Sequence, residues 1–161
     1  PARDLLLPAI PFPDGWEDVV CTINCARREG DVQALRSFVA PPQPGHVIQE
    51  VFKYRNDGDA RESFDAYLKL HGAAYSPQSE AVPQSRAIHL PSGLVDDVFW
   101  GCGMDIVAGC EALLRYDHYF VYFYFSMASD DGYGLTDAEV EQVLVAFDIH
   151  IASIQEQHAT D

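Results

Sequence analysis

The chain has 161 residues, 48% of them hydrophobic, and its 25 acidic side chains against 10 Lys and Arg give a formal net charge of −15. This length and composition predict one domain, residues 1–161, with its own hydrophobic core, and they exclude a disordered chain. The negative charge argues against binding to nucleic acid or to anionic lipid, and it favours solubility or a cationic partner. No run of 18 apolar residues occurs, so we expect no transmembrane segment.

The first half of the chain predicts a short helix followed by a strand. Asp31 is placed to cap a helix that ends near Phe38, before the prolines at 41 and 42. Residues 46–54 alternate in a way typical of a strand that is partly covered on both faces.

A second helix is expected after this strand. Asp59 and Glu62 fit a capping box, and Gly72 is expected to end the helix. One face of this predicted helix is expected to carry Phe64, Tyr67, Leu68 and His71. Short strands are expected at 88–90 and 98–100.

The strongest local signal is a hairpin made of residues 112–116 and 119–127, joined by the two residues at 117 and 118. A two-residue turn sets the pairing between the strands and therefore the face on which each side chain lies. The predicted core face comprises Ala112, Leu114, Tyr116, Tyr119, Val121, Phe123, Phe125 and Met127. The opposite face comprises Leu113, Arg115, Phe120, Tyr122, Tyr124 and Ser126.

The last predicted element is a helix that begins with a capping box of Thr136 and Glu139 and runs to about Gln157. Its apolar stripe comprises Val140, Val143, Leu144, Phe147, Ile151 and Ile154. Glu141, Asp148 and Gln155 are expected on the opposite side of this helix.

Grouped strands with helices between and after them predict an α+β fold, an antiparallel sheet with helices packed on one face. Four cysteines in two close pairs, Cys21 with Cys25 and Cys102 with Cys110, predict two local disulfides. Disulfides persist in oxidising compartments, so we expect an extracytoplasmic domain, secreted or tethered through a removed N-terminal segment. A zinc site and free thiols are the alternatives, although the wide spacing of the second pair does not suit zinc.

Other chemistry has little support in the chain. The six histidines form no zinc motif, the acidic pairs match no calcium loop, and no nucleophile or phosphate-loop motif occurs. We therefore expect no catalytic residue, no metal and no cofactor.

The hairpin carries more aromatic residues than one core face needs. If the helices cover one side of the sheet, Phe120, Tyr122 and Tyr124 face solvent or a groove beside Arg115. These four residues are the predicted contact surface for a ligand or partner. The alternative is that a second layer, such as the Pro-rich segment, covers them.

Several short motifs are shared with one kind of bacterial protein. They are Leu5–Leu7, Phe12–Trp16, the strand Val51–Tyr54 with Ala60 and Phe64 after it, Leu114–Tyr116, Tyr119–Val121, Gly132–Thr136 and Phe147-Asp148. In this order the chain resembles small secreted lipoproteins and receptor-kinase sensor domains of Gram-positive, actinobacterial type. The resemblance implies an extracytoplasmic α+β module that binds a small molecule or a cell-envelope partner without catalysis.

Three functions follow from these observations. The preferred one is a non-catalytic extracytoplasmic sensor or binding domain, not an enzyme. The second is a structural or interaction protein that forms a homodimer through the aromatic hairpin face. The third is a metal-dependent hydrolase that uses the acidic clusters.

Overall fold

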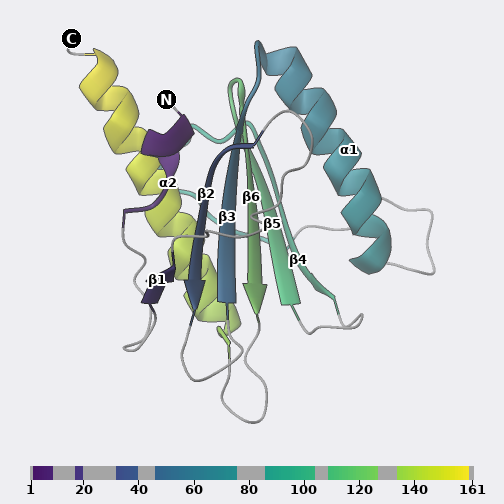
Figure 1. The fold of residues 1–161 in the computed structure, drawn as a ribbon. Coiled ribbons are helices and arrows are strands. Elements are labelled where there is room, and N and C mark those ends of the chain that lie inside the picture. The colour runs from purple at the N-terminus through teal and green to yellow at the C-terminus, as the bar shows by residue number, and fades with distance from the viewer. Residues whose placement is uncertain are drawn as a thin grey trace.

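The computed structural model describes residues 2–8, 17–19, 32–39, 46–75, 86–103, 109–126 and 134–159. These residues form an antiparallel sheet in the order β1-β2-β3-β6-β5-β4, with two long helices (Figure 1). The strands are β1 (Glu17–Val19), β2 (Val32–Val39), β3 (His46–Lys53), β4 (Asp97–Gly103), β5 (Gly109–Tyr116) and β6 (Tyr119–Ser126). A short 3-10 helix, η1 (Ala2–Leu5), begins the chain, α1 (Asp57–Tyr75) follows β3, and α2 (Asp137–Ala159) follows β6. The predicted α+β class and the antiparallel sheet are confirmed.

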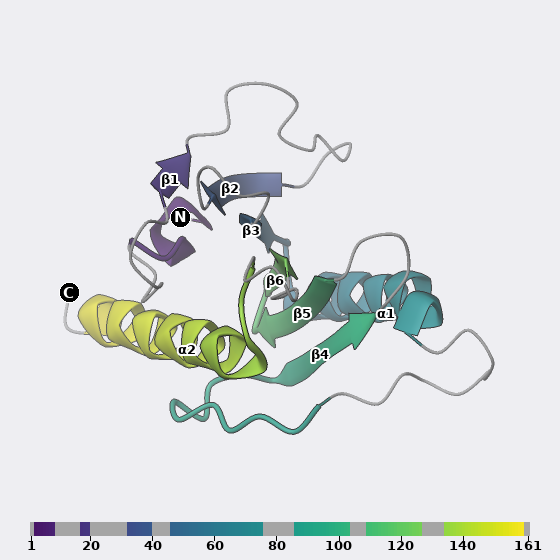
Figure 2. The same cartoon turned by 90° about the horizontal axis from the view of Figure 1, so that it is seen from below.

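The two helices lie on opposite faces of the sheet (Figure 2). Phe120 and Tyr122 of β6 point to the α1 side, where they pack with Phe64 of α1. Val121 and Phe123, the alternate residues, point to the α2 side. The prediction that the helices share one face is therefore wrong, because apolar side chains on both faces of β6 each need a covering layer.

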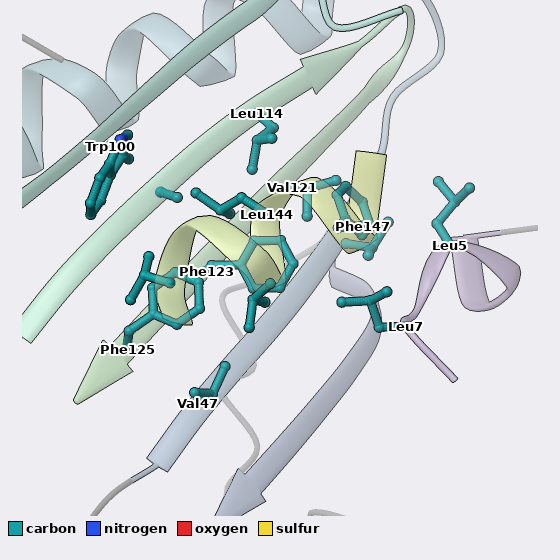
Figure 3. Packing of buried hydrophobic residues seen from close by; sticks show 14 of the residues in the cluster. Leu5, Leu7, Val47, Trp100, Leu114, Val121, Phe123, Phe125, Leu144 and Phe147 are labelled. Atoms are coloured by element: carbon teal, nitrogen blue, oxygen red, sulfur yellow. The ribbon is translucent and has the colours of Figure 1, made fainter. Parts of the chain in front are cut away.

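The larger core lies between the sheet and α2 (Figure 3). Phe123 packs edge-on against Phe147 of α2, with ring centroids 5.3 Å apart, and stacks on Phe125 at 5.5 Å. The predicted α2 stripe faces this core, and only Ile154 is partly exposed. Leu5 and Leu7 close one side of the core, where the buried amide of Gln49 bonds to the main chain of both.

The smaller core lies between the sheet and α1 and is largely aromatic. Phe52 stacks on Phe120 with ring centroids 5.3 Å apart. Tyr67 of α1 meets the Phe120 ring edge-on at 4.8 Å and approaches Tyr122 at 6.0 Å. This packing places α1 over the sheet face of Phe120 and Tyr122, which was predicted to contact a ligand or partner.

Residues 32–39 form a strand, β2, where a helix capped by Asp31 was expected. β2 pairs with β3 along its whole length, with Val32 opposite Phe52 and Val39 opposite His46. Long-range pairing thus overrides the local helix signal. Residues 88–90, expected as a strand, form an irregular connection before β4.

The boundaries of α1 differ from the prediction by a few residues. Asn56 caps the helix, since its Oδ1 accepts from the backbone N–H of Asp59 at 2.9 Å and its Nδ2 donates to the Asp59 carboxylate at 3.0 Å. Asp59 is therefore the third residue of the helix and not the cap. The helix continues three residues beyond Gly72, to Tyr75.

The hairpin and the α2 cap agree with the prediction. In the β5–β6 ladder Tyr116 lies opposite Tyr119 and Leu114 opposite Val121. At the start of α2, Thr136 Oγ1 accepts from the backbone N–H of Glu139 at 3.3 Å, and the Glu139 carboxylate accepts from the Thr136 N–H at 2.7 Å. Both features are local in sequence.

Asp148 of α2, expected on the solvent side of its helix, is fully buried. Its carboxylate accepts from the Ser92 N–H at 2.7 Å, the Ser92 hydroxyl at 2.5 Å and the Tyr116 hydroxyl at 3.1 Å. The prediction is wrong because these donors come from a loop and a strand far away in sequence. A buried carboxylate is tolerated where such donors satisfy it.

Candidate functional site

The candidate site is built around Arg115, near the end of β5 that meets the β5–β6 turn. Its guanidinium side chain is only 3% exposed. The Nε atom donates to Asp97 Oδ2 at 2.7 Å, and one terminal nitrogen lies 2.6 Å from the same oxygen. The other terminal nitrogen binds the Asp57 carboxylate, Asp96 Oδ2 at 3.3 Å and the Asp117 carbonyl at 3.3 Å.

The fold explains why these groups meet. Asp97 lies directly opposite Arg115 in the β4–β5 ladder. Asp57 is in the first turn of α1, which begins at the end of the sheet where the β5–β6 turn lies (Figure 1). A carboxylate in the first turn is also stabilised by the helix dipole. One buried cation thus joins the start of α1, the start of β4 and the hairpin turn.

The Arg115 guanidinium remains positively charged. Burial by itself lowers the pKa of this group, but the hydrogen bond and charge of Asp97, with the charges of Asp96 and Asp57, outweigh it. The net effect is that the pKa of Arg115 is raised above its ordinary value. The carboxylates therefore surround a permanent cation.

The hairpin turn is tied into the same cluster. Asp117 has a φ of 52°, in the left-handed region that Asp tolerates better than most residues. Its N–H donates to Asp96 Oδ2 at 2.6 Å, and its carboxylate lies 2.7 Å from His118 Nδ1. The His118 carbonyl accepts from the Tyr54 N–H at 2.9 Å, which joins the turn to the end of β3.

We call Asp57, Asp96, Asp97 and Asp117 the carboxylate end. Their side chains are 56%, 43%, 34% and 69% exposed, respectively, although Arg115 beneath them is buried. The bonds to Arg115 use one oxygen each of Asp57, Asp96 and Asp97. Within the described residues, the second oxygen of each accepts no hydrogen bond. Arg115 therefore holds three carboxylates in place with part of their surface open to a cation, and the Asp117 carboxylate lies beside them, paired with His118.

Besides Arg115, Arg61 lies near the carboxylate end, 3.8 Å from Asp97. An open groove of about 560 Å³ runs between the end of β3 and the first turns of α1. The groove is lined by Lys53, Tyr54, Arg55, Asp59, Glu62, Ser63 and Ala66.

Of the four predicted contact residues, the structure places only Arg115 in this site. Phe120 is 0% exposed and Tyr122 is 8% exposed, both beneath α1, and Tyr124 is partly buried. The expectation that this face is open is wrong for Phe120 and Tyr122. A second layer does cover them, and it is α1. A dimer through this face would first require α1 to be displaced.

The same sheet face carries a buried carboxylate beside the aromatic residues. Tyr122 donates its hydroxyl hydrogen to Glu111 Oε1 at 2.7 Å. Burial raises the pKa of Tyr124, as does the charge of Glu111, while a hydrogen bond with Ser126 acts in the opposite direction. These groups form an internal polar network of the smaller core.

The disulfide between Cys102 and Cys110 is confirmed. The two residues are direct neighbours across the β4–β5 ladder, with Cα atoms 4.0 Å apart. Cys21 and Cys25 lie outside the described residues, so the second predicted disulfide stays a prediction.

The sequence analysis considered the acidic pairs only as possible metal ligands, and it did not predict that the carboxylate end gathers around Arg115. One part of this cluster could have been predicted. Pairing the expected strand at 98–100 with the hairpin would have placed Asp97 opposite Arg115. Asp57 had no such signal, because its position depends on how α1 packs.

Fold and site together define an α+β domain with an anionic end organised around Arg115. Comparison of the chain with protein-family models, with curated proteins and with solved structures finds no match. The resemblance to secreted lipoproteins and sensor domains therefore stays a prediction. Within the described residues, neither helix is long and apolar enough to cross a membrane.

Proposed function

We propose that this chain is a non-catalytic extracytoplasmic binding domain whose carboxylate end receives a cationic segment of a partner protein. The observation that carries the proposal is the position of Arg115. A nearly buried guanidinium holds three carboxylates, one from the first turn of α1 and two at the start of β4, while leaving each of them 34–56% exposed.

Preorganisation supports a binding role. Four carboxylates close together repel one another, and Arg115 offsets part of that repulsion before any partner arrives. A Lys or Arg side chain that approaches the open oxygens meets groups already in place, so little conformational entropy is lost on binding. The net charge of −15 adds long-range attraction for a cationic partner.

An extracytoplasmic location is supported by the Cys102–Cys110 disulfide, since such bonds persist mainly in oxidising compartments. In that setting the partner is a basic segment of a cell-envelope or secreted protein. A metal-dependent hydrolase at the acidic pairs is not favoured, because Asp57, Asp96 and Asp97 are arranged around a guanidinium.

The test is binding of a deca-lysine peptide, measured by isothermal titration calorimetry at low and at moderate salt. Asp57→Asn with Asp117→Asn removes two charges from the carboxylate end and keeps the shapes of the side chains. Each exposed charge pair contributes up to about 1 kcal/mol, so the double variant should bind about 5- to 20-fold more weakly. The affinity should also fall as salt rises.

The matched control is Glu141→Gln with Glu156→Gln, which removes the same charge from exposed positions on α2. It should change the affinity less than twofold. Equal losses of affinity in the two double variants would mean that peptide binding depends only on the net charge of the domain, and the proposed contact surface would then be wrong.

A further inference from the structure

The Cys102–Cys110 disulfide lies at the far end of the β4–β5 ladder from Arg115. Cys102 is partly exposed, whereas Cys110 is fully buried. Their Cα atoms are 4.0 Å apart, shorter than the roughly 4.5 Å of even the narrow type of antiparallel pair, so the two side chains start very close together. The two sulfur atoms would stay neighbours after reduction, because the sheet pairing sets their positions.

A third side chain reaches the same place from a distant part of the chain. The Asp137 carboxylate, in the first turn of α2, has an oxygen within 4.8 Å of both sulfur atoms. Its backbone is anchored by the Thr136–Glu139 cap and by the Leu135 N–H, which donates to the Ser126 carbonyl at 2.8 Å. Among the described residues, this is the one group of three potential metal ligands with such close ligand atoms.

We propose that reduction of this disulfide creates a binding site for a thiophilic divalent cation such as Zn²⁺, with Cys102, Cys110 and Asp137 as ligands. The site is separate from the carboxylate end and does not depend on its function.

The chemistry requires a dithiol reductant. It supplies two electrons and two protons, its own sulfurs become a disulfide, and the Cys102–Cys110 bond breaks to give two thiols. Each thiol releases its proton to solvent as its sulfur binds the metal, because the thiolate is the ligand. Water takes the fourth position, which is open because Asp137 is exposed.

The distances suit a tetrahedral ion. Zn–S bonds of about 2.3 Å and Zn–O bonds of about 2.0–2.2 Å place the ligand atoms of a tetrahedral site roughly 3.5–3.8 Å apart. The Asp137 oxygen lies within 4.8 Å of both sulfur atoms, and after reduction the two sulfur atoms must move apart from bonding distance to the tetrahedral spacing. Small side-chain rotations, without a change of strand register, are enough to form the site.

Arg86 controls access to the third ligand. Its guanidinium pairs with the Asp137 carboxylate and lies 4.9 Å from the centroid of the Trp100 ring. A metal ion must displace this cation from Asp137. Loss of Arg86 should therefore strengthen metal binding, which is a result that a merely structural ion pair would not produce.

The experiment uses the full chain, reduced with dithiothreitol, desalted without oxygen and titrated with Co²⁺ alone. Thiolate-to-cobalt charge-transfer absorption reports cysteine ligation, and Zn²⁺ should displace the cobalt. The reduced chain should bind Co²⁺ with this signature, and the oxidised chain should not. A Cys21→Ser/Cys25→Ser chain should retain one such site, which separates it from any binding by the first cysteine pair.

Exposed positions provide variants that leave the core intact. Asp137→Asn should weaken Co²⁺ binding at least tenfold, Arg86→Gln should strengthen it, and Glu141→Gln, one turn along α2, should leave it unchanged. The proposal is overturned if the reduced chain shows no charge-transfer band, or if Asp137→Asn binds as well as Glu141→Gln.

Discussion

The Tyr116 hydroxyl donates to the carboxylate of Asp148 across the larger core, with the two oxygen atoms 3.1 Å apart. Tyr116 is on β5 and Asp148 on α2, and the Tyr116 ring also packs edge-on against Phe147 at 5.8 Å. The same carboxylate holds the main chain of Ser92, in the loop before β4. One buried acid therefore joins the helix, the sheet and a loop.

This contact predicts a loss of stability at alkaline pH. Burial, then the charge of Asp148 and its hydrogen bond, raise the pKa of Tyr116 well above its ordinary value of 10.0. Above that ordinary value the unfolded chain releases the phenol proton while the folded chain retains it, so unfolding becomes more favourable. The free energy of unfolding should fall by up to about 1.4 kcal/mol per pH unit from this group.

Urea unfolding of the wild type and of Tyr116→Phe between pH 8 and about pH 11 measures this effect. The variant should lose less stability over that range, since Phe has no proton to release. Parallel pH profiles for the two chains would contradict the prediction. Tyr124, whose pKa is also raised, contributes in the same direction and remains in both chains.

Asp148→Ala should destabilise the domain by about 3 kcal/mol, because it leaves the Ser92 and Tyr116 donors without their acceptor. Glu141→Ala, on the exposed side of the same helix, should change stability by no more than about 0.5 kcal/mol. Both values come from urea unfolding. A small effect of Asp148→Ala would show that water replaces the carboxylate at little cost.

Arg115→Met should destabilise the domain at low salt by about 2 kcal/mol, less than the 3–5 kcal/mol of a fully buried pair because its aspartates are partly exposed. The loss should shrink in 1 M NaCl, since salt screens the repulsion among the carboxylates. Arg36→Met, at a partly buried position on β2, tests whether any Arg-to-Met change behaves in this way. A loss that is independent of salt would mean that packing, not charge, is the role of Arg115.

Phe120→Ala should cost about 3–5 kcal/mol, as expected for a fully buried aromatic residue in contact with the rings of α1. Leu70→Ala, at a 70% exposed position of α1, should have little effect. The double variant Tyr122→Ser with Tyr124→Ser should also unfold more easily. If it kept the stability of the wild type, these tyrosines would be surface residues, contrary to their position in the structure.

Much of the fold could be predicted because its signals are local. The β5–β6 register follows from a two-residue turn, and the α2 cap needs only Thr136 and Glu139. The strand β2 could not be predicted in this way, since pairing with β3 stabilises it against its local helix signal. The covered aromatic face was missed because α1 was assumed to lie on the same side as α2.

The sequence by itself determined the α+β class, the aromatic hairpin and the two amphipathic helices, since short-range periodicity and capping specify these features, and the close spacing of Cys102 and Cys110 predicted their bond. Only the tertiary structure decided which sheet face each helix covers, that Asp148 is an internal anchor, and that Arg115 gathers Asp57, Asp96 and Asp97. The reason is physical. From sequence alone a charged side chain is expected at the surface, because the groups that could pair with it in the interior are not known. For Arg115 these groups are aspartates that lie 18 to 58 residues away along the chain.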